Sequence, residues 1–183
     1  MPAQIYAIPT DTCIGIGCKL DDREWYKMIY ELKWRDKNKP LAILVPSWED
    51  LMYESVLTPT QVNFLRTYKF PFTVVCGIRE DFRDEYPMLD EYDYKTVWFR
   101  VGEACLPAES LPYIRSPFFL TSANKSGEEE CHTIDEVNDV FRDNLTSLKI
   151  LPWLAGNQPS SNVIQFIWTT NDLKYIRKNY PLR

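Results

Sequence analysis

Residues 33–46, KWRDKNKPLAILVP, join a helix to a strand, and this junction decides the fold. Before it, apolar side chains recur with the period of an amphipathic helix, which predicts a helix over residues 22–33 with an aspartate cap. After it, residues 41–45 are continuously apolar between two prolines, as is typical of a buried strand. The sequence therefore predicts that a cationic turn connects a surface helix to a central strand.

Strands and helices continue to alternate on both sides of this junction. Capping sequences predict further helices that start at Ser47, at Thr58-Pro59 and at Thr133. Apolar runs predict further strands at residues 3–8, 72–76, 96–101, 117–122, 147–151, 162–168 and 173–177. This alternation is typical of the α/β class, so we predict a single domain over residues 1–183 with helices flanking a mixed sheet.

The composition is that of a globular protein. The 183 residues are 45% hydrophobic and 26% charged, which excludes a disordered chain. The apolar runs are far shorter than the roughly 18 residues that span a membrane, and no signal segment is visible, so we expect a cytoplasmic protein without membrane contact. The net charge of −5 argues against general nucleic-acid binding, which requires a concentrated positive surface.

Cysteine and histidine usage narrows the chemistry further. Five cysteines without a Cys-x-x-Cys pair indicate neither a disulfide framework nor a zinc site, so we interpret them as reduced, buried thiols. The single histidine, His132, excludes a two-histidine metal site and is interpreted as a solvated loop residue. We assign no residue of the chain as a metal ligand.

Three segments place polar side chains next to a predicted strand. Residues 9–18, PTDTCIGIGC, favour either a tight turn or the close approach of a ligand. Residues 33–39 carry four cations and one acid, a local charge of +3, which either stabilises the helix C-terminus or binds an anion. Residues 121–127, TSANKSG, offer hydroxyl and amide groups. The Pro- and Asp-rich residues 81–94 are interpreted as a long excursion, with a flap over a site as one role.

In this order and at this spacing, the three segments resemble the YrdC-like family, the threonylcarbamoyl-AMP synthases. The specific motifs are Lys33-x-Arg35 with Lys39-Pro40-Leu41, and Ser122-x-Asn124 with Ser126-Gly127. The resemblance covers about Ile5 to Arg177. It implies a twisted α/β sheet with a deep basic cavity, and an enzyme that joins L-threonine, bicarbonate and ATP into threonylcarbamoyl-AMP and releases pyrophosphate.

The resemblance implies four residues for threonine binding. Arg35 would take the carboxylate of threonine, and Thr12 would hold the same substrate. Thr73 and Ser161 are further candidates on the same basis. Cations and fixed dipoles can hold two anionic substrates together without a histidine or a covalent nucleophile, so the scarcity of histidine is no obstacle.

The resemblance implies a second set of residues for the nucleotide and its phosphates: Lys33, Ser122, Asn124 and Arg177. Lys33 and Arg35 would be the catalytic residues, since they bring positive charge to the reacting phosphate. Magnesium would travel with ATP, held mainly by phosphates and water.

The same resemblance implies that the product is passed to proteins that transfer the threonylcarbamoyl group to tRNA. Two alternatives remain open from the sequence. One is a YciO-like family member that kept the fold without this activity, although that branch lacks the Ser-x-Asn motif found here. The other is an RNA-binding module that uses the basic rim of the cavity for a weak RNA contact.

Overall fold

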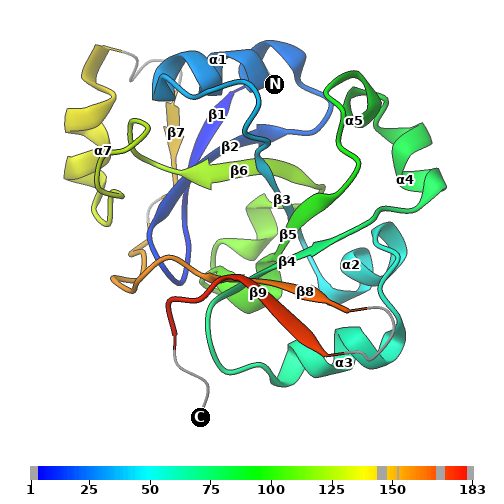
Figure 1. Ribbon diagram of the computed structural model, residues 1–183. Helices are drawn as coiled ribbons and strands as arrows, with labels where there is room; N and C mark the ends of the chain where they lie inside the picture. The colour runs from blue at the N-terminus through cyan, green and yellow to red at the C-terminus, as the bar shows by residue number, and fades with distance from the viewer. Residues whose placement is uncertain (1–3, 144–147, 152, 168–171, 181–183) are drawn as a thin grey trace.

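A mixed nine-stranded sheet runs through the residues that the computed structural model describes, 4–143, 148–151, 153–167 and 172–180. Its order is β7-β1-β2-β6-β3-β5-β4-β8-β9 (Figure 1). The central strand β3 pairs parallel with β5 and antiparallel with β6, so the predicted mixed sheet is confirmed. The strands are β1 (Ile5–Pro9), β2 (Ile14–Lys19), β3 (Ala42–Val45), β4 (Phe72–Cys76), β5 (Val97–Val101), β6 (Phe118–Ser122), β7 (Leu148–Ile150), β8 (Asn162–Phe166) and β9 (Leu173–Arg177).

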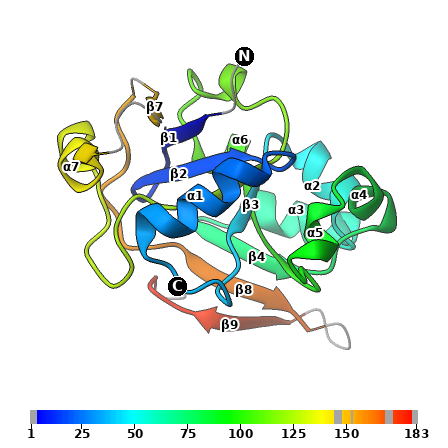
Figure 2. The same ribbon diagram turned by 90° about the horizontal axis from the view of Figure 1, so that it is seen from above.

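Most helices cover one face of this sheet. Figure 2 shows α1 lying over the strands, and its buried Ile29 belongs to the same apolar core as Leu51 of α2 and Phe82 of α4. The helices are α1 (Arg23–Lys33), α2 (Trp48–Glu54), α3 (Pro59–Thr67), α4 (Glu80–Glu85), α5 (Met88–Glu91), α6 (Gly102–Cys105) and α7 (Ile134–Val140), with a 3₁₀ turn η1 (Leu111–Tyr113). The predicted flanking helices are therefore confirmed.

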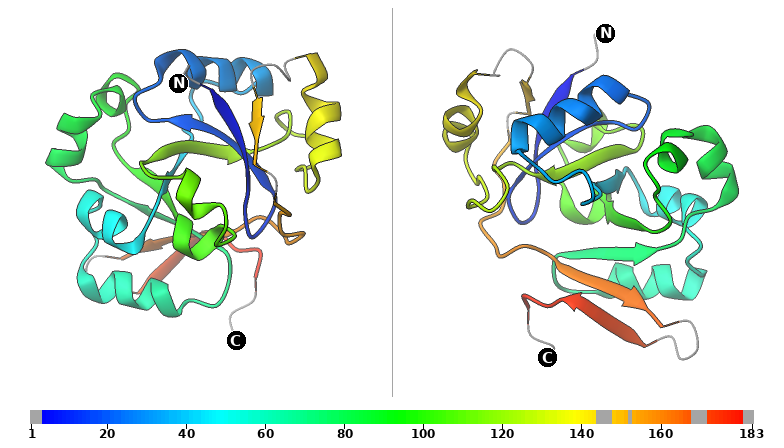
Figure 3. Two further views of the ribbon diagram at one scale, coloured as in Figure 1. Left: turned by 180° about the vertical axis from the view of Figure 1, so that it is seen from behind. Right: turned by 45° about the horizontal axis from the view of Figure 1, so that its top comes forward.

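The opposite face of the sheet is covered only in part. A smaller apolar cluster joins Leu44, Phe118 and Leu120 of the sheet to Cys105 of α6. The view from behind shows α6 and η1 in front of the strands (Figure 3, left). Beside this cluster none of the described helices lies on the same face, and that uncovered part holds the candidate site.

The helix ends follow from local capping chemistry. Asp22 accepts a hydrogen bond from the Trp25 N–H at 3.3 Å and begins α1. Ser47, Thr58 and Thr133 each begin a helix, as predicted, and each forms a complete capping box. The box at Thr58 was not predicted, since the sequence signal there was a cap followed by proline. These signals act within four residues, which is why the sequence alone locates them.

Strand β2 was not predicted. Residues 9–18 were interpreted as a turn or ligand loop, whereas the turn occupies only 10–13 and residues 14–19 are a strand paired with β1 and β6. Gly17 explains the close pairing with β6, because a Cβ there would lie 2.2 Å from the Phe119 carbonyl oxygen. Gly17 thus serves sheet packing, whereas Gly15 lies on the floor of the cavity described below.

Residues 81–94 are not a flap over the candidate site. They include α4 and α5, which bury Phe82 and Leu89, and the following segment, which buries Tyr94; none of residues 81–94 lines the cavity described below. The predicted strands otherwise agree with the structure to within two residues at the described ends. Positions 3, 147 and 168, where three of them were predicted to start or end, lie outside the described residues.

The cysteine prediction is confirmed, since all five cysteines are buried and unpaired. His132 is half-buried, and its Nδ1 lies 3.0 Å from the Gly156 carbonyl oxygen, so it is held at a loop crossing and is not freely solvated. Within the described part of the chain, no helix has the length and apolarity needed to cross a membrane.

The carboxyl group of Glu54 provides a test of the packing at the end of α2. One of its oxygens, Oε2, is buried with no hydrogen-bond partner among the described residues. Burial, with smaller effects of Asp50 and Glu85, raises the pKa of Glu54 to about 8. An unfolded chain ionises this group near pH 4.5, so the folded state loses stability as the pH rises from there through about 8.

Glu54→Gln should therefore raise the melting temperature at pH 8 by about 2–4 °C, which corresponds to about 1 kcal/mol for a chain of this size. At pH 5 the gain should be much smaller. Calorimetry at both pH values tests this, with exposed Glu109→Gln as the control. An unchanged or lower melting temperature at pH 8 would show that the carboxyl is not destabilising.

Candidate active site

Five adjacent strands form the floor of a cavity of about 380 Å³ on the uncovered face of the sheet. Side chains alternate along a strand, so on β5 Val97 and Phe99 enter the helix-covered core while Trp98 and Arg100 face the cavity. The floor consists of Gly15 on β2, Leu120 and Ser122 on β6, Ala42 on β3, Trp98 and Arg100 on β5, and Thr73 on β4.

One end of the cavity is built by the turn after α1, and we call it the Arg35 end: Arg35, Asn38, Lys39 and Pro40. The chain turns sharply there because Trp34 takes the left-handed conformation with φ 51°. The Arg35 guanidinium is then fixed, since Nε donates to the Lys39 carbonyl oxygen and Nη2 to the Pro40 carbonyl oxygen, both at 3.0 Å. A guanidinium held in this way presents its remaining donors in a fixed geometry.

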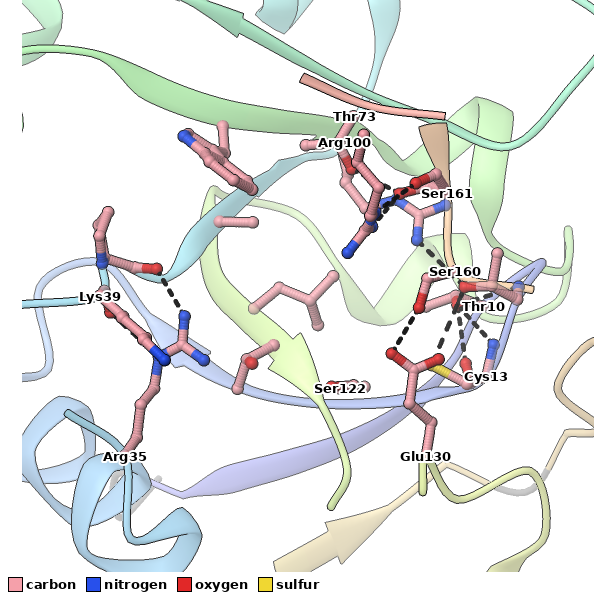
Figure 4. Close-up of a pocket in the computed structure, with 18 of the residues that line it drawn as sticks. Thr10, Cys13, Arg35, Lys39, Thr73, Arg100, Ser122, Glu130, Ser160 and Ser161 are labelled. Carbon is pink, nitrogen blue, oxygen red and sulfur yellow. Dashed lines mark hydrogen bonds between the residues drawn. The ribbon is translucent and has the colours of Figure 1, made fainter. Parts of the chain in front are cut away.

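The other end is rich in hydroxyl groups, and we call it the hydroxyl end: Thr10, Thr12, Thr73, Ser160 and Ser161. Figure 4 shows Arg35 and Lys39 on one side of the cavity and Thr10, Cys13, Ser160 and Ser161 on the other. Burial raises the pKa of the Cys13 thiol to about 12, so Cys13 stays protonated near neutral pH.

Arg100 is the central cation of the hydroxyl end. Its side chain is 9% exposed and forms an ion pair with Asp11, and its Nη1 donates to the Thr12 hydroxyl at 3.4 Å. Its Nε is buried with no partner among the described residues. Arg100 therefore brings a buried positive charge to the Thr12 side of the cavity, with one donor left over.

A second cation, Arg177 of β9, lies beside a hydroxyl pair. Thr73 and Ser161 are hydrogen bonded at 2.8 Å. Arg177 donates through Nε to the Ser161 carbonyl oxygen at 2.9 Å and through Nη2 to its hydroxyl at 3.4 Å. These contacts tie β9 to the wall of the cavity and add a second guanidinium to the hydroxyl end.

Residues 153–161 close this end by running along the turn after β1. The Gly156 N–H donates to the Thr10 carbonyl oxygen at 2.7 Å, and a Cβ at position 156 would lie 1.9 Å from the Asp11 carbonyl oxygen. Only glycine permits this approach. The segment then places Ser160, whose hydroxyl donates to Glu130 at 2.7 Å, so Glu130 adds a carboxylate to the cavity.

Lys33 lies behind the cavity wall and does not line it. Its side chain is buried, and its ammonium donates to the Ser122 carbonyl oxygen at 2.5 Å, the Asn124 carbonyl oxygen at 2.7 Å and Asn124 Oδ1 at 2.8 Å. The Ser122 hydroxyl donates to the same Oδ1 at 2.7 Å. We call these three residues the Lys33 cluster.

The Lys33 cluster uses every hydrogen of the ammonium group for the protein itself. Burial, with a smaller effect of Arg35, lowers the pKa of Lys33 to about 8, so the three oxygens are needed to hold the charged form. The N–H of Ser126 donates back to the Lys33 carbonyl oxygen at 2.8 Å. The cluster therefore fixes the end of β6 against the end of α1.

The structure brings six of the eight predicted site residues into one cavity and leaves two behind its wall. Lining it are Thr12, Arg35, Thr73, Ser122, Ser161 and Arg177. Lys33 and Asn124 do not line it, although they hold Ser122 in place. The expected threonine set is also divided, because Arg35 lies across the cavity from Ser161 (Figure 4).

Sequence reasoning missed Arg100 and Glu130 as parts of the site. Arg100 was seen only as part of a strand, and the signal for it was a cation inside an otherwise apolar run, Val97–Val101. Glu130 is the last of three consecutive glutamates, and nothing in the sequence distinguishes it from its neighbours.

Removal of the Lys33 ammonium should cost folding stability. In Lys33→Met the buried Ser122 and Asn124 oxygens lose their shared donor, which we expect to cost at least about 2 kcal/mol, or about 4–8 °C in melting temperature. Exposed Lys37→Ala is the matched control and should be nearly silent. Normal stability with lost nucleotide binding would instead mean that Lys33 contacts the ligand directly.

Comparisons with known proteins agree with this architecture. The sequence model of the Sua5/YciO/YrdC family, described as "Telomere recombination", matches residues 3–178. Threonylcarbamoyl-AMP synthase of Vibrio campbellii is 27% identical over 161 residues, 86% of this chain and 85% of the relative. The enzyme of the same name from Yersinia enterocolitica is 28% identical over 166 residues, 88% of this chain and 84% of the relative.

Solved structures of the same architecture are also similar. P. abyssi Sua5 complexed with L-threonine has a TM-score of 0.72 at 25% identity over 95% of this chain, which spans about half the length (50%) of that Sua5 chain. E. coli YciO has a TM-score of 0.75 at 18% identity, with 96% of this chain and 83% of YciO covered, and this likeness shows the fold alone. Since the family model matches nearly the whole sequence, the chain belongs to the Sua5/YciO/YrdC family.

Proposed function

We propose that this protein is a threonylcarbamoyl-AMP synthase, which joins L-threonine, bicarbonate and ATP and releases pyrophosphate. One observation carries the proposal: a single cavity has Arg35 at one end and Arg100 with Arg177 at the other, with hydroxyl groups around the second pair. Two anionic substrates can therefore lie end to end between fixed cations. Relatives named threonylcarbamoyl-AMP synthase support this proposal.

The reaction requires positive charge and positioning more than a protein nucleophile. The amine of threonine and bicarbonate form a carbamate with loss of water. A carbamate oxygen then attacks the α-phosphorus of ATP, and the bond to the β-phosphate breaks as pyrophosphate leaves. Both reacting groups are anions, so fixed guanidinium groups lower the barrier by offsetting their repulsion.

We assign threonine to the hydroxyl end. Arg100 lines the cavity and donates through Nη1 to the Thr12 hydroxyl at 3.4 Å, so its guanidinium brings positive charge beside a carboxylate bound there. Thr73 and Ser161 supply hydroxyls for the polar groups of the amino acid, with Arg177 behind them. This replaces Arg35, which the sequence had suggested as the carboxylate partner.

We assign the nucleotide to the Arg35 end and the middle of the cavity. Arg35 and Lys39 border that end, and the Ser122 hydroxyl lies on the floor near the centre. Lys33 and Asn124 then act as positioning residues through Ser122. Magnesium would arrive on the ATP phosphates and keep water ligands, with Glu130 as the available carboxylate of the cavity.

The two alternatives, a YciO-like protein and an RNA-binding module, are distinguished from the synthase in different ways. A YciO-like protein without this activity would share the fold, as E. coli YciO does, and only an assay separates the two. An RNA-binding module would need its cations on an open surface. Of the four cations in residues 33–39, Lys33 is buried and Arg35 lines the cavity, so an RNA surface would depend on the exposed Lys37 and Lys39 alone. This favours a small-molecule site.

Pyrophosphate release from ATP should require threonine and bicarbonate together. Omission of each substrate in turn, with mass spectrometry of the product, tests the proposal directly. Serine should be a weaker substrate, because one lost methyl contact costs about 1–3 kcal/mol. Equal pyrophosphate release without any amino acid would rule the synthase out, and no release with all three substrates would favour the YciO-like alternative.

Substitutions of Arg100 and Arg35 should affect the KM values of different substrates. Arg100→Lys should raise the KM for threonine by about 30- to 150-fold, because loss of a planar fork costs about 2–3 kcal/mol. The KM for ATP should change little. Arg35→Lys should show the reverse pattern, and exposed Arg115→Lys is the control. A larger threonine effect in Arg35→Lys would restore the assignment that the sequence suggested.

A further inference from the structure

Trp98 is the largest side chain on the cavity floor. It is half-buried on β5, between two residues that enter the core, so its indole faces the cavity beside Arg100. An aromatic ring on the floor of a small-molecule cavity offers a flat apolar face to a ligand.

The strand register places Trp98 toward the Arg35 end. Ile43 of β3 pairs with Phe99 of β5, so the preceding residue, Ala42, lies beside Trp98. Ala42 in turn pairs with Leu120 of β6. Ala42 also follows Pro40 by only two residues, and the Pro40 carbonyl oxygen is held by Arg35.

Strand β5 therefore presents a different kind of side chain to each end of the cavity. Arg100 is two residues beyond Trp98, about 6.6 Å along the strand, and contacts Thr12 of the hydroxyl end. Trp98, Ala42 and Leu120 form a continuous apolar surface, with the cations of the Arg35 end next to it. A flat apolar surface beside cations matches a nucleobase whose phosphates lie further along the same cavity.

We propose that Trp98 is the stacking platform for the base of the bound nucleotide and so determines which end of the cavity the nucleotide occupies. This inference rests on the proposed function for the identity of the ligand. Ala42 leaves room above the floor for the base, because its side chain is a single methyl group. The ribose and phosphates then extend past Ser122 toward Arg100, where the carbamate of threonine would meet the α-phosphate.

The test compares a ligand with a base to one without, and requires no turnover. Binding of AMP and of ribose 5-phosphate is measured by calorimetry for the unmodified chain, Trp98→Ala and Trp98→Phe. Trp98→Ala should weaken AMP binding by roughly 5- to 150-fold, the range for loss of one base–aromatic stack. Ribose 5-phosphate binding should stay unchanged, and Trp98→Phe should retain most of the AMP affinity.

Trp153→Phe is the matched control, since Trp153 packs against Tyr113 away from the cavity. Equal losses for AMP and ribose 5-phosphate, or unchanged AMP binding in Trp98→Ala, would overturn the platform. So would a change in threonine affinity without a change for AMP. If the chain releases no pyrophosphate yet shows the expected AMP pattern, the platform stands and only the synthase proposal fails.

Discussion

The position of the candidate site depends on one buried ammonium group. Lys33 ends α1 and donates its three hydrogens to oxygens of Ser122 and Asn124 at the end of β6. A buried charge is tolerated only when it is fully hydrogen bonded, so helix and strand ends are locked in one arrangement. Two residues later Arg35 faces the cavity from the helix side, and Ser122 faces it from the strand side. The cluster thus sets the spacing between the two groups that we assign to the nucleotide.

The rest of the site follows from an unequal covering of the sheet. Six of the helices bury their apolar residues with one set of strand residues, and α6 with η1 covers only part of the other face. The uncovered strands present their alternate residues, including Trp98 and Arg100, to a common cavity. Arg100 is paired with Asp11, so the cavity gains a fixed guanidinium whose charge is partly balanced within the protein. Strand β5 thus places an apolar side chain, Trp98, toward the Arg35 end of the cavity and a cationic side chain, Arg100, at the hydroxyl end.

Local signals made most of the fold predictable from the sequence. The capping boxes at Ser47, Thr58 and Thr133 act within one helical turn, and the apolar runs define strands by composition alone. Strand β2 was missed because alternating isoleucine and glycine also suits a loop, and only its pairing with β6 shows why the glycines are there. The charge on Lys33 was visible, but its role depends on acceptors 89 and 91 residues away. The place of Arg100 in the site likewise depends on its ion pair with Asp11, which is 89 residues away in the sequence.

The central claim is that one cavity holds the amino acid and the nucleotide at opposite ends. A crystal structure of the chain with L-threonine and AMP tests it most directly. The account predicts threonine beside Thr12 and Arg100, the base over Trp98, and the phosphate between them near Ser122. A nucleotide bound with its base at the hydroxyl end, or bound outside this cavity, would contradict it.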